Sequence, residues 1–175
     1  MRRSLVLLTA LLLFGVGVTV TGSTAATDAP GCEGLSAYRV AMFRLWTTDD
    51  GTPVPSAGLK DRDPRTLSSD EWLEIADAAL TYQRALRAIT PPSFAAAWHQ
   101  ALIESAGLVE SMSRSIAKDG IMAAYVYASP IDASNQEIAD ATTQGSATCA
   151  DFGAFVRAYD ALGDTTNATP AATPS

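Results

Sequence analysis

The chain has 175 residues, with 12 basic and 19 acidic side chains and a net charge of −7. This length suits a single domain. The acidic balance argues against binding to nucleic-acid phosphates or to anionic lipid headgroups, because both repel a negatively charged surface. Nearly all basic residues are Arg, and together with the many Ala residues this composition is typical of a bacterial protein.

Residues 1–26 are predicted to be a secretory signal peptide. Arg2 and Arg3 precede an apolar run that ends near Val20, and small residues follow it. This order is typical of a cleaved signal, and the run is short for a membrane span, which needs roughly 20 residues. The alternative is an uncleaved anchor. We expect a secreted, periplasmic or envelope protein without stable membrane insertion after cleavage, and loss of the two Arg residues changes the net charge from −7 to −9.

Cys32 and Cys149 are the only cysteines, and in an exported protein they are expected to form a disulfide. Their spacing excludes a C-x-x-C redox motif, and the sequence has no C-x-x-C-H haem attachment site. The bond would close a loop of more than a hundred residues. In the chain-entropy description such a loop contributes about 4–5 kcal/mol. The alternative is a pair of free, buried thiols.

The first half of the mature chain predicts two helices. Apolar side chains recur at helical spacing over residues 33–47, whereas residues 48–67 contain three Pro and two Gly and predict a loop. A second helix is predicted after Ser68, which has the spacing of a capping box with Glu71. It should end before Pro91, because the residue preceding a proline is pushed out of the helical region.

A third helix is predicted to open at Pro92, where the missing proline N–H costs nothing. Gly120 is expected to break or bend this helix. Residues 121–128 are apolar almost all round, so they are predicted to be deeply buried. Pro130 is expected to close the helix.

The fourth helix is predicted to begin near Ser134, with a capping box to Glu137, and to stop at Gly163. It is either continuous past Gly145, with a closely packed waist, or it restarts at Thr148. No segment shows the alternating pattern of a strand.

The predicted architecture is therefore an all-α, up-down four-helix bundle over residues 27–163, with either the third or the fourth helix broken and one disulfide. Short connections favour antiparallel neighbours. We expect the first helix to run antiparallel to the fourth and to pack against its earlier half. Residues 164–175 are rich in Thr, Ala, Pro and Asn and predict a disordered tail.

His99 is the only histidine and the one weak candidate for a ligand or a general base. A metal site needs three or four ligands, commonly His with a carboxylate at helical spacing, and Glu104 is five residues away. The alternative is a histidine hydrogen-bonded to a neighbouring helix or loop. We therefore predict no metal and no cofactor.

The sequence offers no nucleophile–base pair, because it lacks both G-x-S-x-G and S-x-x-K. We expect a non-catalytic exported protein that binds a protein or small-molecule partner through a helical face or the long loop. An exposed apolar patch on the folded surface would support this binding role. The alternative is a carrier of a small apolar ligand or metal, with an internal cavity lined by Trp72, Trp98 or Tyr125 and His99 pointing inward. An enzyme of unidentified class is the second alternative.

Overall fold

The computed structural model describes residues 28–46 and 63–165, with side chains up to residue 161. Every regular element in these ranges is a helix, and none of the helices described there is long and apolar enough to cross a membrane. The predicted signal peptide, most of the predicted loop and nearly all of the predicted tail lie outside the described residues. The α-helices are α2 (Leu35–Arg44), α3 (Ser69–Arg87), α4 (Ala96–Asp119), α5 (Ala128–Thr148) and α6 (Ala150–Thr165).

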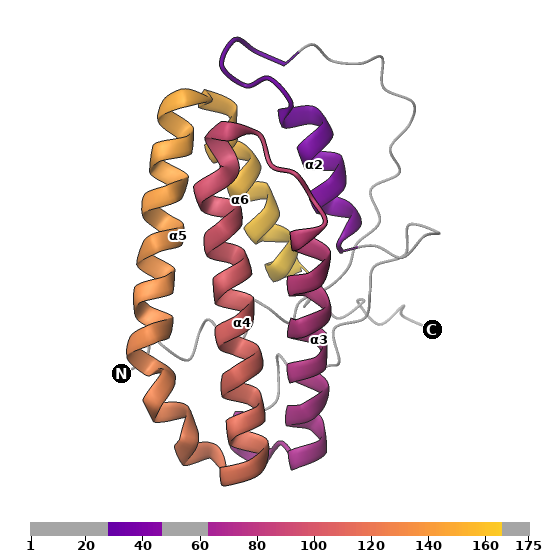
Figure 1. Ribbon diagram of the computed structural model, residues 1–175, viewed down its shortest axis with the longest axis vertical. Helices are drawn as coiled ribbons and strands as arrows, with labels where there is room; N and C mark the ends of the chain where they lie inside the picture. Colours follow the sequence, from indigo (N-terminus) through magenta and orange to yellow (C-terminus); the bar gives the residue numbers. More distant parts are fainter. Residues whose placement is uncertain (1–27, 47–62, 166–175) are drawn as a thin grey trace, which may run out of the picture.

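Three long antiparallel helices, α3, α4 and α5, lie side by side and form the body of the molecule (Figure 1). Helix α6 turns back from the end of α5, and α2 lies beside it at the same end of the bundle (Figure 1). The all-α bundle with one disulfide is therefore confirmed, and its predicted fourth helix is broken in two.

Helices α2 and α6 run parallel, so the predicted antiparallel pairing of the first and fourth helices is wrong. A disulfide joins Cys32 and Cys149, which precede the two helices directly. Six residues further along each chain segment, the rings of Tyr38 and Phe155 meet at 5.7 Å. The disulfide thus aligns the starts of both helices, and α2 packs against the segment that follows Cys149 rather than the one before it.

The capping box that opens α3 is confirmed. The Ser68 hydroxyl accepts from the Glu71 N–H, and the Glu71 carboxylate accepts from the Ser68 N–H at 2.7 Å. Helix α2 is shorter than its predicted range of 33–47. The carboxylate of Asp28 accepts from the N–H groups of Gly34 and Ser36 at 2.8 and 3.0 Å, which satisfies donors that the first turn leaves open.

The predicted break at Gly120 is confirmed, because α4 ends at Asp119 and Gly120 has a φ of 83°. A 3-10 helix, η3 (Ile121–Tyr127), follows and contains no buried residue, so the predicted deep burial of 121–128 is wrong. This segment joins two long antiparallel helices at the end of the bundle (Figure 1). One of its faces has no neighbouring helix to cover it.

Two further boundaries differ from prediction. Helix α5 begins at Ala128 and continues through Pro130, which is tolerated in a first turn because no N–H is needed there. Ser134 is therefore a buried residue inside the helix and not its cap. At the other end, α6 continues past Gly163 to Thr165.

The alternative in which the fourth helix restarts is confirmed, but α6 begins at Ala150, two residues after the predicted restart at Thr148. Helix α5 ends at Thr148, and the backbone of Cys149 is extended, with φ −123° and ψ 106°. Gly145 also packs closely: a Cβ there would lie 2.6 Å from ring carbons of Phe152 and from the carbonyl oxygen of Phe94. The alternative of a continuous fourth helix is therefore wrong, although the close packing expected with it is present at Gly145.

Two clusters of buried side chains form the core, one at each end of the bundle. The larger cluster surrounds the disulfide and brings α2 and α6 together with parts of α3, α4 and α5. The smaller cluster lies where α3, α4 and α5 meet beneath η3, and contains Trp72, Ile75, Ala79, Val109, Met112, Ile116 and Ile131.

Candidate functional site

His99 lies in the core with only 3% of its surface exposed, and both of its ring nitrogens are hydrogen-bonded. Nε2 is 2.9 Å from the carbonyl oxygen of Leu86, and Nδ1 is 2.8 Å from the hydroxyl of Tyr38. A carbonyl only accepts, so Nε2 carries the proton and Nδ1 accepts from the tyrosine. The imidazole thus links α4 to the ends of α2 and α3.

Burial of His99 lowers the pKa of its imidazole, and the hydrogen bond to Leu86 opposes this effect only partly. Burial also raises the pKa of Tyr38 far above its ordinary value. Both side chains are therefore neutral near pH 7. No group of three His, Cys, Asp or Glu side chains within the described ranges could hold a metal ion, so His99 has no co-ligands there.

The three aromatic residues proposed to line an interior cavity do not come together. Trp98 belongs to the larger core cluster, where the rings of Phe152, Phe155 and Tyr159 meet its ring at 5.5–5.7 Å. Trp72 lies in the smaller cluster at the other end. Tyr125, by contrast, is on the surface.

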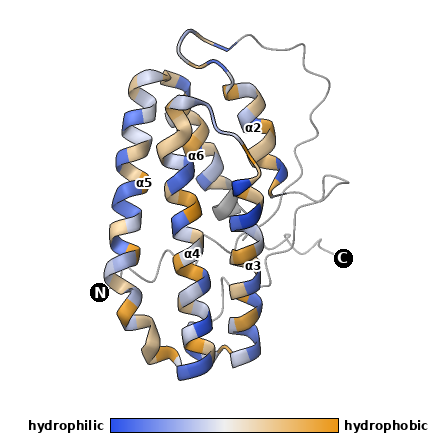
Figure 2. Ribbon diagram, viewed as in Figure 1, coloured by the Kyte–Doolittle hydropathy of each residue, from blue (hydrophilic) through white to orange (hydrophobic). Residues whose placement is uncertain are grey.

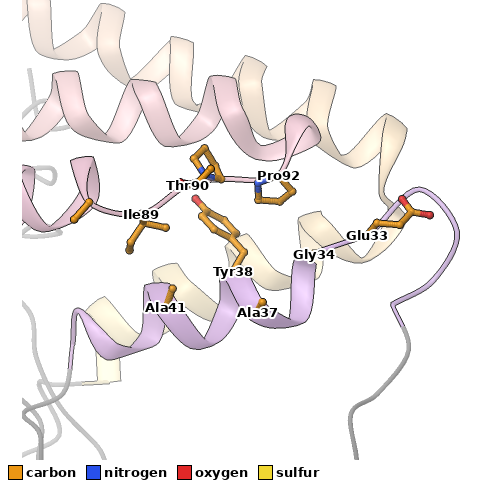
Figure 3. A pocket seen from close by; sticks show the side chains of 10 residues that line it. Glu33, Gly34, Ala37, Tyr38, Ala41, Ile89, Thr90 and Pro92 are labelled. Atoms are coloured by element: carbon orange, nitrogen blue, oxygen red, sulfur yellow. The ribbon is translucent and has the colours of Figure 1, made fainter.

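A groove of about 580 Å³ lies between α2 and the segment that connects α3 to α4 (Figure 3). The ring of Tyr38 stands between the two walls, and Glu33 lies at one end (Figure 3). Because the Tyr38 hydroxyl is already bonded to His99, the groove offers mainly small apolar surfaces. Its lining consists of Glu33, Gly34, Ala37, Tyr38, Ala41, Ala88, Ile89, Thr90, Pro91 and Pro92.

A second feature is an apolar surface formed by Met122, Tyr125 and Val126, which we call the tip. These side chains are 69%, 72% and 74% exposed, more than the other large apolar side chains in the described ranges. They lie on η3, and residues three apart in a 3-10 helix share one face, so Met122 and Tyr125 are aligned. Hydrophobic residues gather at this turn of the bundle (Figure 2).

The tip is held in place by the other side of η3. Ile121, Ala124 and Tyr127 pack against the smaller core cluster. The Tyr127 hydroxyl also lies 2.9 Å from the hydroxyl of Ser115 on α4. The exposed side chains are therefore carried on an anchored backbone.

Sequence reasoning recognised residues 121–128 as apolar but assigned them to the core. The signal that could have corrected this is their position between Gly120 and Pro130. A short connection that is apolar on all faces cannot bury every face at the end of a bundle.

No protein-family model matches the sequence, and neither the search of curated proteins nor that of solved structures gives a significant match.

Proposed function

We propose that this chain is an exported, non-catalytic interaction protein of the bacterial envelope or the surrounding medium, and that the tip is its contact surface. The exposure of Met122, Tyr125 and Val126 carries the proposal. Single exposed apolar side chains are common in soluble proteins, whereas three large ones on one seven-residue element are typical of an interaction site. Met and Tyr are also enriched in contact surfaces.

Preorganisation of the tip supports this role. A contact surface on a mobile segment loses affinity because its side chains and backbone must be ordered on binding. Here Ile121 and Tyr127 hold η3 against the bundle, so much of that ordering is already present in the free protein.

The exported location is supported by two features. Cys32 and Cys149 form a disulfide, and such bonds persist mainly in oxidising compartments outside the cytosol. Residues 1–26 have the pattern of a signal peptide. The non-catalytic role is supported by His99, because the residue is buried and both of its ring nitrogens already have partners inside the core.

The test is to replace the tip side chains together, as Met122→Ser, Tyr125→Ser and Val126→Ser, and to follow the protein in its own host. Val40→Ser is the matched control, because Val40 is half exposed on α2, away from η3. We expect the envelope-bound fraction to fall several-fold in the tip variant and to stay unchanged in the control. Equal distribution of wild type and tip variant, with both folded by circular dichroism, would refute the proposal.

The groove favours a second candidate, a carrier of a small apolar ligand. Its volume of about 580 Å³ lies within the range of small-molecule sites. It differs from the predicted interior cavity, because it is an open groove between α2 and the α3–α4 connection and is not lined by Trp72, Trp98 or Tyr125. Native mass spectrometry of the protein recovered from its host should show extra mass that leaves on denaturation and that is absent after Ala37→Trp, which would fill the groove. A bare protein in both samples would exclude this candidate.

A further inference from the structure

We infer that the tip inserts into the interfacial region of a zwitterionic lipid bilayer. This inference rests on the proposed function and names the partner of the same surface.

The small area of the tip favours a bilayer over a protein as its partner. About seven tenths of a Tyr, a Met and a Val amounts to on the order of 400 Å² of surface. A stable protein–protein interface buries about 800 Å² on each partner, so the tip alone is too small for a second copy of this chain or for a flat protein surface. A bilayer needs no matching shape, and every exposed apolar side chain contributes to its binding.

The chemistry of the tip suits the boundary between headgroups and acyl chains. Tyr125 combines an apolar ring with a polar hydroxyl, which is why tyrosine gathers at this depth. Met122 and Val126 lack a hydroxyl, so their burial among the acyl chains costs no hydrogen bond. The backbone of η3 makes its own 3-10 hydrogen bonds, such as Ala123 N–H to the Gly120 carbonyl at 2.9 Å, so few open polar groups would enter the lipid.

The shape of the molecule allows this contact. The tip lies at one end of the long axis, and the disulfide and the groove lie toward the other end (Figure 1). At this end the described residues place η3 beside the end of α4 and the start of α3, so the bundle can approach a membrane end-on (Figure 1). The groove would then face away from the lipid.

Charge selects the class of lipid. The exposed side chains directly before η3 are Lys118 and Asp119, which have opposite signs and nearly cancel. The chain as a whole carries −7. An anionic bilayer repels such a protein, whereas a zwitterionic bilayer does not. The expected preference is therefore the reverse of that shown by proteins that bind membranes through a basic patch.

The experiment uses vesicles of phosphatidylcholine and vesicles that contain one third phosphatidylglycerol, with the processed protein from its host. Every variant carries the same N-terminus, so binding through that segment cancels in the comparison. The native Trp46, Trp72 and Trp98 are all buried, so an indole introduced by Tyr125→Trp is the one that lipid can reach among the described residues. Its emission should shift to shorter wavelength on phosphatidylcholine and be quenched by brominated acyl chains.

We expect co-flotation with phosphatidylcholine to fall at least several-fold in the triple Ser tip variant and to be unchanged in Val40→Ser. Binding to the anionic vesicles should be weaker and should partly recover with added salt. The inference is overturned if the introduced indole shows no shift at about millimolar lipid, if the tip variant floats like wild type, or if the anionic vesicles bind more protein.

Failure of the lipid inference can be separated from failure of the proposed function. If the tip variant is lost from the envelope fraction of the host but the purified wild type binds neither kind of vesicle, the tip is a contact surface for another class of partner. If the tip variant keeps its place in the envelope fraction, the proposed function itself fails.

Discussion

Removal of the disulfide should produce a large and equal loss of stability whichever cysteine is replaced. Cys32 and Cys149 are separated by 117 residues, and closing a loop of this length in the unfolded chain corresponds to about 4–5 kcal/mol. Both side chains are fully buried, so replacement by Ala adds a small packing loss of about 1 kcal/mol. Whole domains are stable by only about 5–15 kcal/mol.

The folded state should nevertheless survive at low temperature, because α2 has other ties to the bundle. Tyr38 bonds to His99, and the ring of Trp46 meets those of Tyr82 and Tyr159 at 5.2–5.6 Å. For a domain of about 150 residues, 1 kcal/mol moves the melting temperature by about 2–4 °C, so we expect a decrease of about 10–20 °C.

The assay is urea unfolding of Cys32→Ala, Cys149→Ala and the double variant, with and without reductant. Each single change breaks the same bond, so the double variant should match the singles within about 1 kcal/mol instead of summing them. The variants should be insensitive to reductant, whereas wild type should fall to their level. Additive losses, or a wild type that reductant leaves unchanged, would refute a stabilising cross-link.

Three further predictions concern packing and titration in the same half of the molecule. Gly145→Ala should lower the free energy of unfolding in urea by about 1–2 kcal/mol, because the clash of the new Cβ with the Phe152 ring outweighs the gain of about 1 kcal/mol in helix propensity. Gly107→Ala is the control: its Cβ would meet only the end of the flexible Gln83 side chain, so the change should be neutral or stabilising. Tyr38→Phe should cost about 1–3 kcal/mol by thermal unfolding, because Nδ1 of buried His99 loses its donor. The pKa of His99 is lower in the folded than in the unfolded protein, so the stability contributed by its neutral imidazole is complete above the unfolded pKa of about 6.5. This contribution is lost as pH falls toward the folded pKa, at up to about 1.4 kcal/mol per pH unit. The free energy of unfolding measured between pH 6.5 and 5.5 should show this slope in wild type and lack it in His99→Gln.

Local signals in the sequence predicted the fold well where one residue decides the backbone. Ser68 with Glu71 fixed the start of α3, and Gly120 marked the end of α4, because capping geometry and left-handed backbone depend on a few neighbouring residues. The pairing of Cys32 with Cys149 followed from there being only two cysteines.

Contacts between distant segments could not be predicted in the same way. The periodicity of residues 121–128 shows that they are apolar but not whether a neighbouring helix covers them, and this decides between core and contact surface. Pro130 predicts the end of a helix from the sequence, although the same residue is equally suited to a first turn, where the structure has it. The sequence pattern therefore predicts burial for the three tip residues, and only the structure shows that they are exposed.

The partners of His99 show why a single polar residue could not be assigned from its own helix. Tyr38 lies 61 residues away, and in the sequence it is one more member of the apolar stripe of the first helix. Helix α2 has only ten residues, too few to be stable alone, so its position depends on ties to other segments. A neutral Tyr–His bond is directional in a way that apolar contacts are not, and together with the disulfide it fixes both the axial position and the rotation of α2. The only histidine is thereby explained by the placement of a short helix. At the opposite end of the bundle, the exposed apolar side chains of the tip have no such internal partner among the described residues, which makes them the stronger candidate for a contact with another molecule.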